Sequence, residues 1–435
     1  MTAEIAVLNK EAVALSADSA STVWTGAGPK VFNSVSKIFG LTKGEPVGVM
    51  LYGQAAFLGV PWETVIRAFR DNRKAQACDT LAGYGTEFID FIEGWDEMFP
   101  ADAQEAYVAR TIYGYFAYLW ERIEEAVTAV WDAQGPLRRS QTKAIAREVI
   151  ATHHQAWKDA TDTGGSLAGS AEEIRTQFAG QIKAARLEVF AKTRIGSGTA
   201  RYLTEIAGWL FTKQPAVGSH PEVSGVVIAG FGTDEYFPHL VSYEFEGMVF
   251  DKVKFTEGEP VRVGRAPDTA MAAVVPFAQH DSVRAFMEGL HPDAGTAIGN
   301  EVGRLLTDYP AEVLDNAGVS AQTRTKVLDA FAQQHEAERE KIGKRVSGYL
   351  EREHVSPVLD IVGVLPKDEL AMMAESLVNL TSFRHRVSFG AETVGGPIDV
   401  AVISKGDGFV WIKRKHYFKQ ELNPQLVAHK YGGTA

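Results

Sequence analysis

The chain has 435 residues, of which 45% are hydrophobic and 23% charged, as in an average globular protein. Its formal net charge of −11 argues against nucleic acid as the main partner, because no basic patch stands out that would neutralise phosphates. The single cysteine, Cys78, excludes an intramolecular disulfide and a thiolate metal site. Without a leader segment or a run of about 18 apolar residues, we expect a cytoplasmic protein with no membrane partner.

Four short apolar runs near the start of the chain are typical of strands. The first two, Glu4 to Leu8 and Ala12 to Ala17, are separated by three polar residues, which predicts a hairpin. The third run is Lys37 to Leu41, and the fourth is Pro46 to Tyr52. Gly53 then leads into an amphipathic run with helical spacing. The beginning of the chain therefore predicts a sheet followed by a covering helix.

Thr2 is the candidate nucleophile. Removal of Met1 is expected because the next residue is small, and it would leave Thr2 with both a hydroxyl and a free α-amine. Such an amine titrates at about 7.7 to 8.0 and can accept the hydroxyl proton, which makes the oxygen nucleophilic. Asp18 follows the predicted hairpin, so it should return alongside Thr2. A lysine cation held there by Asp18 would favour the neutral amine, and Lys37 is the lysine that we expect in this position.

A second lysine competes for this role. The segment PKVFNS (29–34) partly repeats the pattern of SKIFGL (36–41), so Lys30 is an alternative to Lys37. Lys37 is preferred because the apolar run after it leads into the next strand, whereas Asn33 and Ser34 favour a turn. Either lysine could also be an ordinary solvated side chain, which is the commonest environment of lysine.

The order of these residues resembles the proteasome β-subunits, which belong to the N-terminal nucleophile (Ntn) hydrolases. The resemblance rests on Thr2, ALSADSA (14–20), KIFGL (37–41) and VGVMLYG (47–53). Two later blocks resemble the central strand pair and the closing strand hairpin of that family: VVIAGFGTDEYFPHLVSYEFEG (226–247) and GGPIDVAVISKGDGFVWI (395–412). Together the similar parts cover a little under half of the chain.

The resemblance implies both a fold and a chemistry. The fold would be α+β, a four-layer αββα sandwich with two antiparallel sheets between helices. Thr2 would be nucleophile and base, Asp18 and Lys37 the charge pair that tunes it, and the Gly53 N–H the oxyanion donor, a contribution of about 3 to 4 kcal/mol to the barrier. The substrate would be a peptide or a small amide, cleaved through an acyl-enzyme on Thr2. Proteasome-like proteins form rings, which implies a homo-oligomer.

Some supporting groups of the family have no clear counterpart here. The aspartate and serine that usually precede the Gly-Gly of the last hairpin fall on Ala391 and Val394. Glu392, beside them, would substitute after a shift of one residue and is kept as a candidate catalytic residue. A further serine of the family, at the start of a helix, falls near positions 278–280, which contain no serine. The alternative function is therefore a catalytically inactive proteasome-like scaffold or assembly subunit.

The rest of the chain reads as two helical insertions. Apolar residues at helical spacing fill much of the first, and a long charged helix over 322–354 dominates the second. The eleven histidines show no H-E-x-x-H or comparable spacing, so we expect no metal and no cofactor. The expected organisation is an Ntn core in three parts separated by the insertions: core 1–78, insertion 79–222, core 223–290, insertion 291–366, and core with C-terminal tail 367–435.

Overall fold

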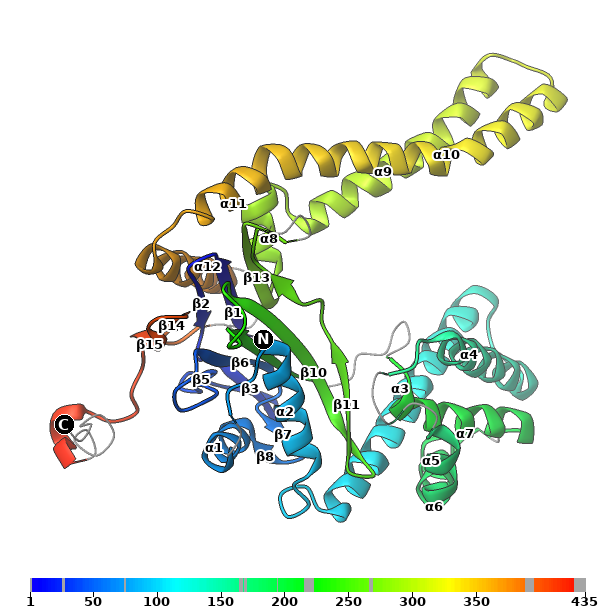
Figure 1. Ribbon diagram of the computed structural model, residues 1–435. Coiled ribbons are helices and arrows are strands. Elements are labelled where there is room, and N and C mark those ends of the chain that lie inside the picture. Colours follow the sequence, from blue (N-terminus) through cyan, green and yellow to red (C-terminus); the bar gives the residue numbers. More distant parts are fainter. Residues whose placement is uncertain are drawn as a thin grey trace.

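The structure is a computed structural model, and two antiparallel sheets form its centre (Figure 1). The chain is a mixed α+β protein with several antiparallel sheets, as the sequence predicts. The residues that the structure describes are 2–25, 28–73, 76–163, 167, 170–193, 195–214, 223–265, 269–387 and 395–425.

The first sheet has five strands in the order β13-β1-β2-β14-β15. The predicted hairpin is confirmed, because β1 pairs with β2 and sets Ile5 opposite Ser16. Every residue of these two strands is buried, which explains why both read as nearly continuous apolar runs. The strand bounds are Ala3–Asn9 (β1), Ala12–Ala17 (β2), Ala272–Ala278 (β13), Asp399–Ser404 (β14) and Gly408–Lys413 (β15).

The second sheet contains β11-β10-β9-β6-β5 in that order, with β12 paired to β10. The predicted strands after Lys37 and Pro46 are present as β5 and β6, and the two pair antiparallel. The bounds are Ile38–Gly40 (β5), Val47–Gly53 (β6), Ser224–Gly230 (β9), His239–Val249 (β10), Lys252–Glu257 (β11) and Val261–Arg262 (β12). Two small hairpins, β3 (Ser21–Thr25) with β4 (Gly28–Phe32) and β7 (Ala56–Phe57) with β8 (Val60–Pro61), lie outside both sheets.

The two sheets pack face to face through an apolar core. Leu8 and Leu15 of the first sheet share this core with Met50 and Val227 of the second. The approach is close at Gly48, where an added Cβ would lie 2.6 Å from Ile403 Cδ1. A residue larger than glycine would therefore require the Ile403 and Phe409 side chains to shift.

Helices cover the outer face of each sheet. On the first sheet, α12 (Lys367–Val387) and α8 (Asp281–Glu288) bury Ile5 and Val7. On the second sheet, α1 (Trp62–Asn72) and α2 (Leu81–Glu93) pack against strands β6, β9 and β10. The helix predicted after Gly53 is thus present as α1, and its apolar side faces the sheet.

A group of helices follows α2 in the chain and has an apolar core of its own. Its longest member, α3, ends before Gly135, whose φ of +80° is unfavourable for other residues. This group is joined to the second sheet by Lys254, whose Nζ donates to Leu210 O at 2.8 Å and pairs with Glu246 at 2.7 Å. The bounds are Ala101–Gln134 (α3), Arg139–Asp159 (α4), Ala171–Gln177 (α5), Ala179–Val189 (α6) and Ser197–Thr212 (α7).

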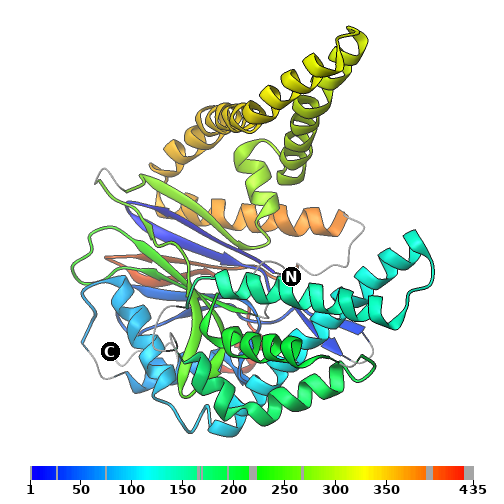
Figure 2. The same cartoon turned by 90° about the vertical axis from the view of Figure 1, so that its right-hand side faces the viewer.

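A helical arm projects from the body of the protein, as both views show (Figures 1 and 2). It consists of α9 (Pro292–Asn316) and α10 (Ala321–Leu350), which pack against each other. Neither helix has a fully buried side chain. The long charged helix expected over 322–354 is confirmed as α10, continued by one π-helical turn, η1 (Glu351–Val355). The chain then passes through α11 (Ser356–Val362) into α12, and a 3₁₀ turn, η2 (Gln420–Leu422), follows β15.

Candidate active site

Thr2 lies immediately before β1, at the edge of the inter-sheet core, with an exposed fraction of only 6%. Its carbonyl oxygen accepts a hydrogen bond from Gln279 N at 3.3 Å, which ties this part of the chain to the end of β13. Side chains alternate along β1, and Ala6 and Leu8 face the second sheet. The same alternation places Thr2 and Glu4 on the inter-sheet side.

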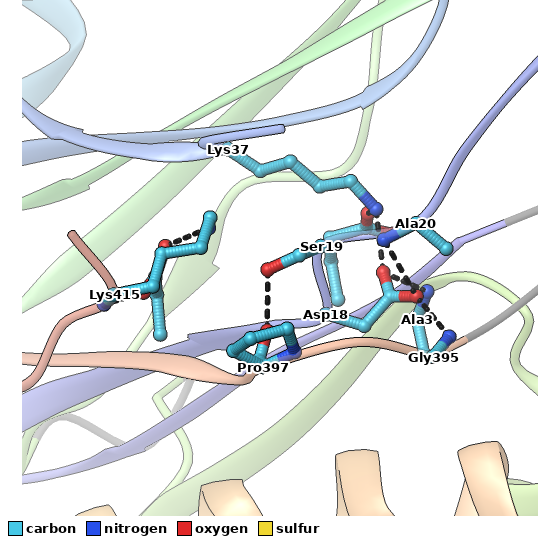
Figure 3. A network of polar contacts seen from close by, with 10 residues as sticks. Ala3, Asp18, Ser19, Ala20, Lys37, Gly395, Pro397 and Lys415 are labelled. Atoms are coloured by element: carbon cyan, nitrogen blue, oxygen red, sulfur yellow. Dashed lines mark hydrogen bonds and ion pairs between the residues drawn. The ribbon is translucent and has the colours of Figure 1, made fainter. Parts of the chain in front are cut away.

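Asp18 is held by backbone groups from three separate parts of the chain (Figure 3). Its carboxylate accepts from Ala3 N at 3.2 Å, Ala20 N at 3.4 Å and Gly395 N at 2.8 Å. Its own backbone N–H donates to Ala3 O at 3.1 Å, which continues the β1–β2 ladder. The aspartate therefore returns beside the start of β1, as the hairpin predicts.

Lys37 reaches Asp18 from the start of β5, in the other sheet (Figure 3). Lys37 Nζ lies 2.5 Å from Asp18 Oδ1, and the whole residue is 4% exposed. Its carbonyl accepts from Leu51 N at 2.8 Å, which fixes its backbone against β6. Lys30, by contrast, is exposed on β4 and its Nζ lies 5.1 Å from the centre of the Phe32 ring. The structure thus brings Lys37, and not Lys30, to the aspartate.

Glu4 is a third charged residue of this cluster, which the sequence reasoning missed. Its carboxylate is fully buried, and Oε1 lies 3.0 Å from Lys37 Nζ. Burial raises the pKa of Glu4 to about 7. The Lys37 ammonium counteracts the rise, the Asp18 charge adds to it, and the Thr2 hydroxyl opposes it. A sequence signal did exist, because Glu4 is the one charged residue within the otherwise apolar AEIAVL.

A cavity of about 660 Å³ opens beside these residues. Its wall includes Thr2, Lys37 and Gly53, so the candidate nucleophile, the cation and the candidate oxyanion donor face one space. Further lining comes from 33–36 before β5, from α1 and from the segment after β15. Ligand pockets typically have volumes of about 300 to 1,000 Å³, so this cavity can take a short peptide segment or a small amide.

Gly53 ends β6 with a φ of +75°, a conformation that favours glycine. An added Cβ would lie 2.3 Å from Val223 O, closer than any real contact. The backbone conformation and the close contact with Val223 therefore require glycine at position 53 whether or not its N–H takes part in catalysis.

Of the remaining segments that the sequence analysis singled out, the structure describes 278–280 but not the segment that contains Glu392. Glu392, together with Ala391 and Val394, lies outside the described residues. The segment 278–280 is described, and Gln279 links Thr2 to α12, because its Oε1 lies 2.9 Å from His385 Nε2. Burial lowers the pKa of His385, with Arg384 adding to the effect and Asp18 opposing it, which places a further titratable group near the cluster.

Within the described ranges, no group of three or more His, Cys, Asp or Glu side chains is arranged to hold a metal ion. No helix in the same ranges is long and apolar enough to cross a membrane. No protein-family model and no curated protein sequence matches the chain. The chemistry of the site must therefore be inferred from its geometry: a buried hydroxyl at a cavity wall, backed by an ammonium that two carboxylates hold.

Proposed function

We propose that this protein is a threonine-type Ntn hydrolase that cleaves an amide bond, preferably a peptide bond, through an acyl-enzyme on Thr2. The observation that carries this proposal is the ion pair between Lys37 and Asp18, 2.5 Å long, beside a buried Thr2 at the wall of a cavity. The arrangement of two sheets between outer helices supports the further proposal that the fold is the four-layer αββα sandwich of that family.

The proposed reaction begins after removal of Met1. The freed α-amine of Thr2 accepts the hydroxyl proton while Oγ attacks the substrate carbonyl carbon. Lys37 favours the neutral amine, because two nearby cations disfavour one another. The negative charge that develops on the carbonyl oxygen is stabilised by the Gly53 N–H. The leaving amine takes up the proton, and water activated by the same α-amine then releases the acid.

The substrate class and the setting belong to the same proposal. A peptide or a small amide fits the cavity volume of about 660 Å³. The cluster supplies the nucleophile, the cation and the oxyanion donor from the chain itself, so the proposed reaction uses no metal and no organic cofactor. We also propose that the protein acts as a homo-oligomer in the cytoplasm.

A specific observation favours a second candidate function. The resemblance sets the family's serine near the described segment 278–280, which is Ala-Gln-His and contains no hydroxyl. A scaffold or assembly subunit that keeps the fold without the reaction would show such a loss.

An N-terminal threonine trap separates the two functions. The intact protein is treated with a β-lactone or an epoxyketone, and its mass is measured before and after treatment. We expect a mass that corresponds to a chain starting at Thr2, and a single adduct on that residue. Thr2→Ala should abolish the adduct, whereas Thr325→Ala, which removes an exposed threonine on the helical arm, should leave it unchanged. If the protein begins with Thr2 and yet gains no adduct, the result supports the inactive scaffold or assembly subunit over the hydrolase.

A further inference from the structure

Glu4 is fully buried, like Asp18. Its strand neighbours in the first sheet are Ala17 on β2 and Phe277 on β13. The Phe277 ring stacks on Tyr52 of β6, with ring centres 5.4 Å apart, so aromatic rings from both sheets close over this region. The titratable groups near Glu4 include Lys37, Asp18 and Tyr52. Burial is the main cause of the raised pKa of the Tyr52 phenol, and the Glu4 charge adds to the rise.

The cluster holds two carboxylates and one ammonium. Asp18 is well satisfied, since three backbone N–H groups and Lys37 donate to it. Lys37 Nζ lies 3.0 Å from Glu4 Oε1, but this contact is poorly aligned for a hydrogen bond. Neither Glu4 oxygen receives a well-directed hydrogen bond from a residue that the structure describes. Asp18 alone would hold Lys37, and a second buried carboxylate costs stability. A structural role therefore does not account for Glu4.

We propose that Glu4 is a catalytic residue whose carboxylate accepts the proton of the Thr2 hydroxyl during attack on the substrate. This role rests on the proposed function, because it keeps Thr2 as the nucleophile. Glu4 then replaces the α-amine as the acceptor of the hydroxyl proton, and the α-amine keeps its role in activating the water that releases the acid. Two observations support it: Glu4 and Thr2 share one face of the strand, and neither oxygen of the fully buried Glu4 carboxyl has a well-aligned hydrogen-bond partner among the residues that the structure describes.

The step balances within the cluster. The Thr2 O–H bond breaks, and its proton passes to a Glu4 oxygen. The Oγ–carbon bond forms, and the electron pair of the carbonyl moves to its oxygen, beside Gly53. When the carbon–nitrogen bond breaks, the proton leaves Glu4 for the departing nitrogen, and the carboxylate is restored. A general base works best when its pKa lies near the working pH, and about 7 meets that condition.

The test is the rate of Thr2 labelling by a β-lactone, measured from pH 5 to pH 9. Glu4→Gln keeps the size of the side chain but cannot accept a proton. We expect it to slow labelling at least about 100-fold, the lower end for loss of a general base, and to remove the inflection near pH 7. The matched control is Glu244→Gln, an exposed carboxylate bonded to the Tyr52 hydroxyl at 3.0 Å, which should stay within threefold of the wild type.

A second variant keeps the proposal testable if Glu4→Gln does not fold. Glu4→Ala leaves space for a small carboxylate, and added formate should raise its labelling rate at least tenfold. A Thr2-dependent label whose rate and pH profile are unchanged by Glu4→Gln overturns the role of Glu4 and leaves the proposed function intact. Equal labelling of the wild type and Thr2→Ala overturns the proposed function, and the role of Glu4 with it.

Discussion

Replacing Glu4 by glutamine should make the protein more stable at alkaline pH and leave its stability unchanged under acid conditions. Glutamine has nearly the same shape, so the packing around the side chain is kept while its charge is removed. The change therefore isolates the free energy of holding an ionised carboxyl in a fully buried position beside Lys37 and Asp18.

The magnitude follows from the pKa of Glu4, which is about 7 in the folded protein in place of 4.5. At 1.36 kcal/mol per pH unit, ionising Glu4 costs the folded protein about 3 kcal/mol more than it costs the unfolded chain. Because the pKa of Glu4 is raised in the folded protein, the contribution of its protonated carboxyl to stability is complete below pH 4.5. This contribution is lost as the pH rises through about 7. Glu4→Gln does not suffer this loss.

Thermal unfolding of both proteins at pH 5 and at pH 8 measures the effect. We expect similar unfolding midpoints at pH 5, and at pH 8 a midpoint for Glu4→Gln that is higher by the order of a few degrees. Glu244→Gln, which removes an exposed carboxylate, should show no such dependence. If the midpoints of Glu4→Gln and the wild type differ equally at both pH values, or differ with the opposite sign, ionisation of Glu4 does not destabilise the folded protein.

Three further predictions concern the charge pair, the glycine and the assembly. Lys37→Met leaves two buried carboxylates without their cation, so it should cost about 3 to 5 kcal/mol of stability at pH 8 and abolish labelling of Thr2. Lys30→Met, the control, should change neither the stability nor the labelling. Equal unfolding midpoints for the two variants would contradict this prediction. Gly53→Ala introduces strain at a φ of +75° and should lower the midpoint, while Gly44→Ala, where an added Cβ meets nothing within 4 Å, should leave it unchanged. A native mass spectrum should show multiples of the 47.4 kDa chain, because α9 and α10 carry large apolar side chains in solvent; a monomer at micromolar concentration counts against this.

Much of the local structure and part of the site could be predicted from the sequence. The apolar runs around residues 9–11 predict the β1–β2 hairpin, and the hairpin alone returns Asp18 to the start of β1. The choice of Lys37 over Lys30 followed from the strand that continues after it, and the ion pair agrees with that choice. These inferences succeed because each depends on residues that are near neighbours in the chain.

Glu4 shows where this kind of reasoning stops. A glutamate in an apolar strand indicates burial but does not reveal which charge faces it. The partner, Lys37, comes from the other sheet, and the covering rings of Tyr52 and Phe277 come from two further strands. The cavity likewise has walls from segments scattered between Thr2 and 418, and its volume depends on how they pack.

The pattern of residues along the chain predicts the main strands and the covering helix, and it puts a hydroxyl, a carboxylate and a lysine where the first strands begin or end. Which charges share one buried space, and therefore the proton affinity of Glu4, depends on how distant segments of the chain pack together. The physical reason is that periodicity and turn residues act over a few positions of the chain. The pKa of a buried group depends on desolvation and on charges within a few ångströms, and packing alone brings those together.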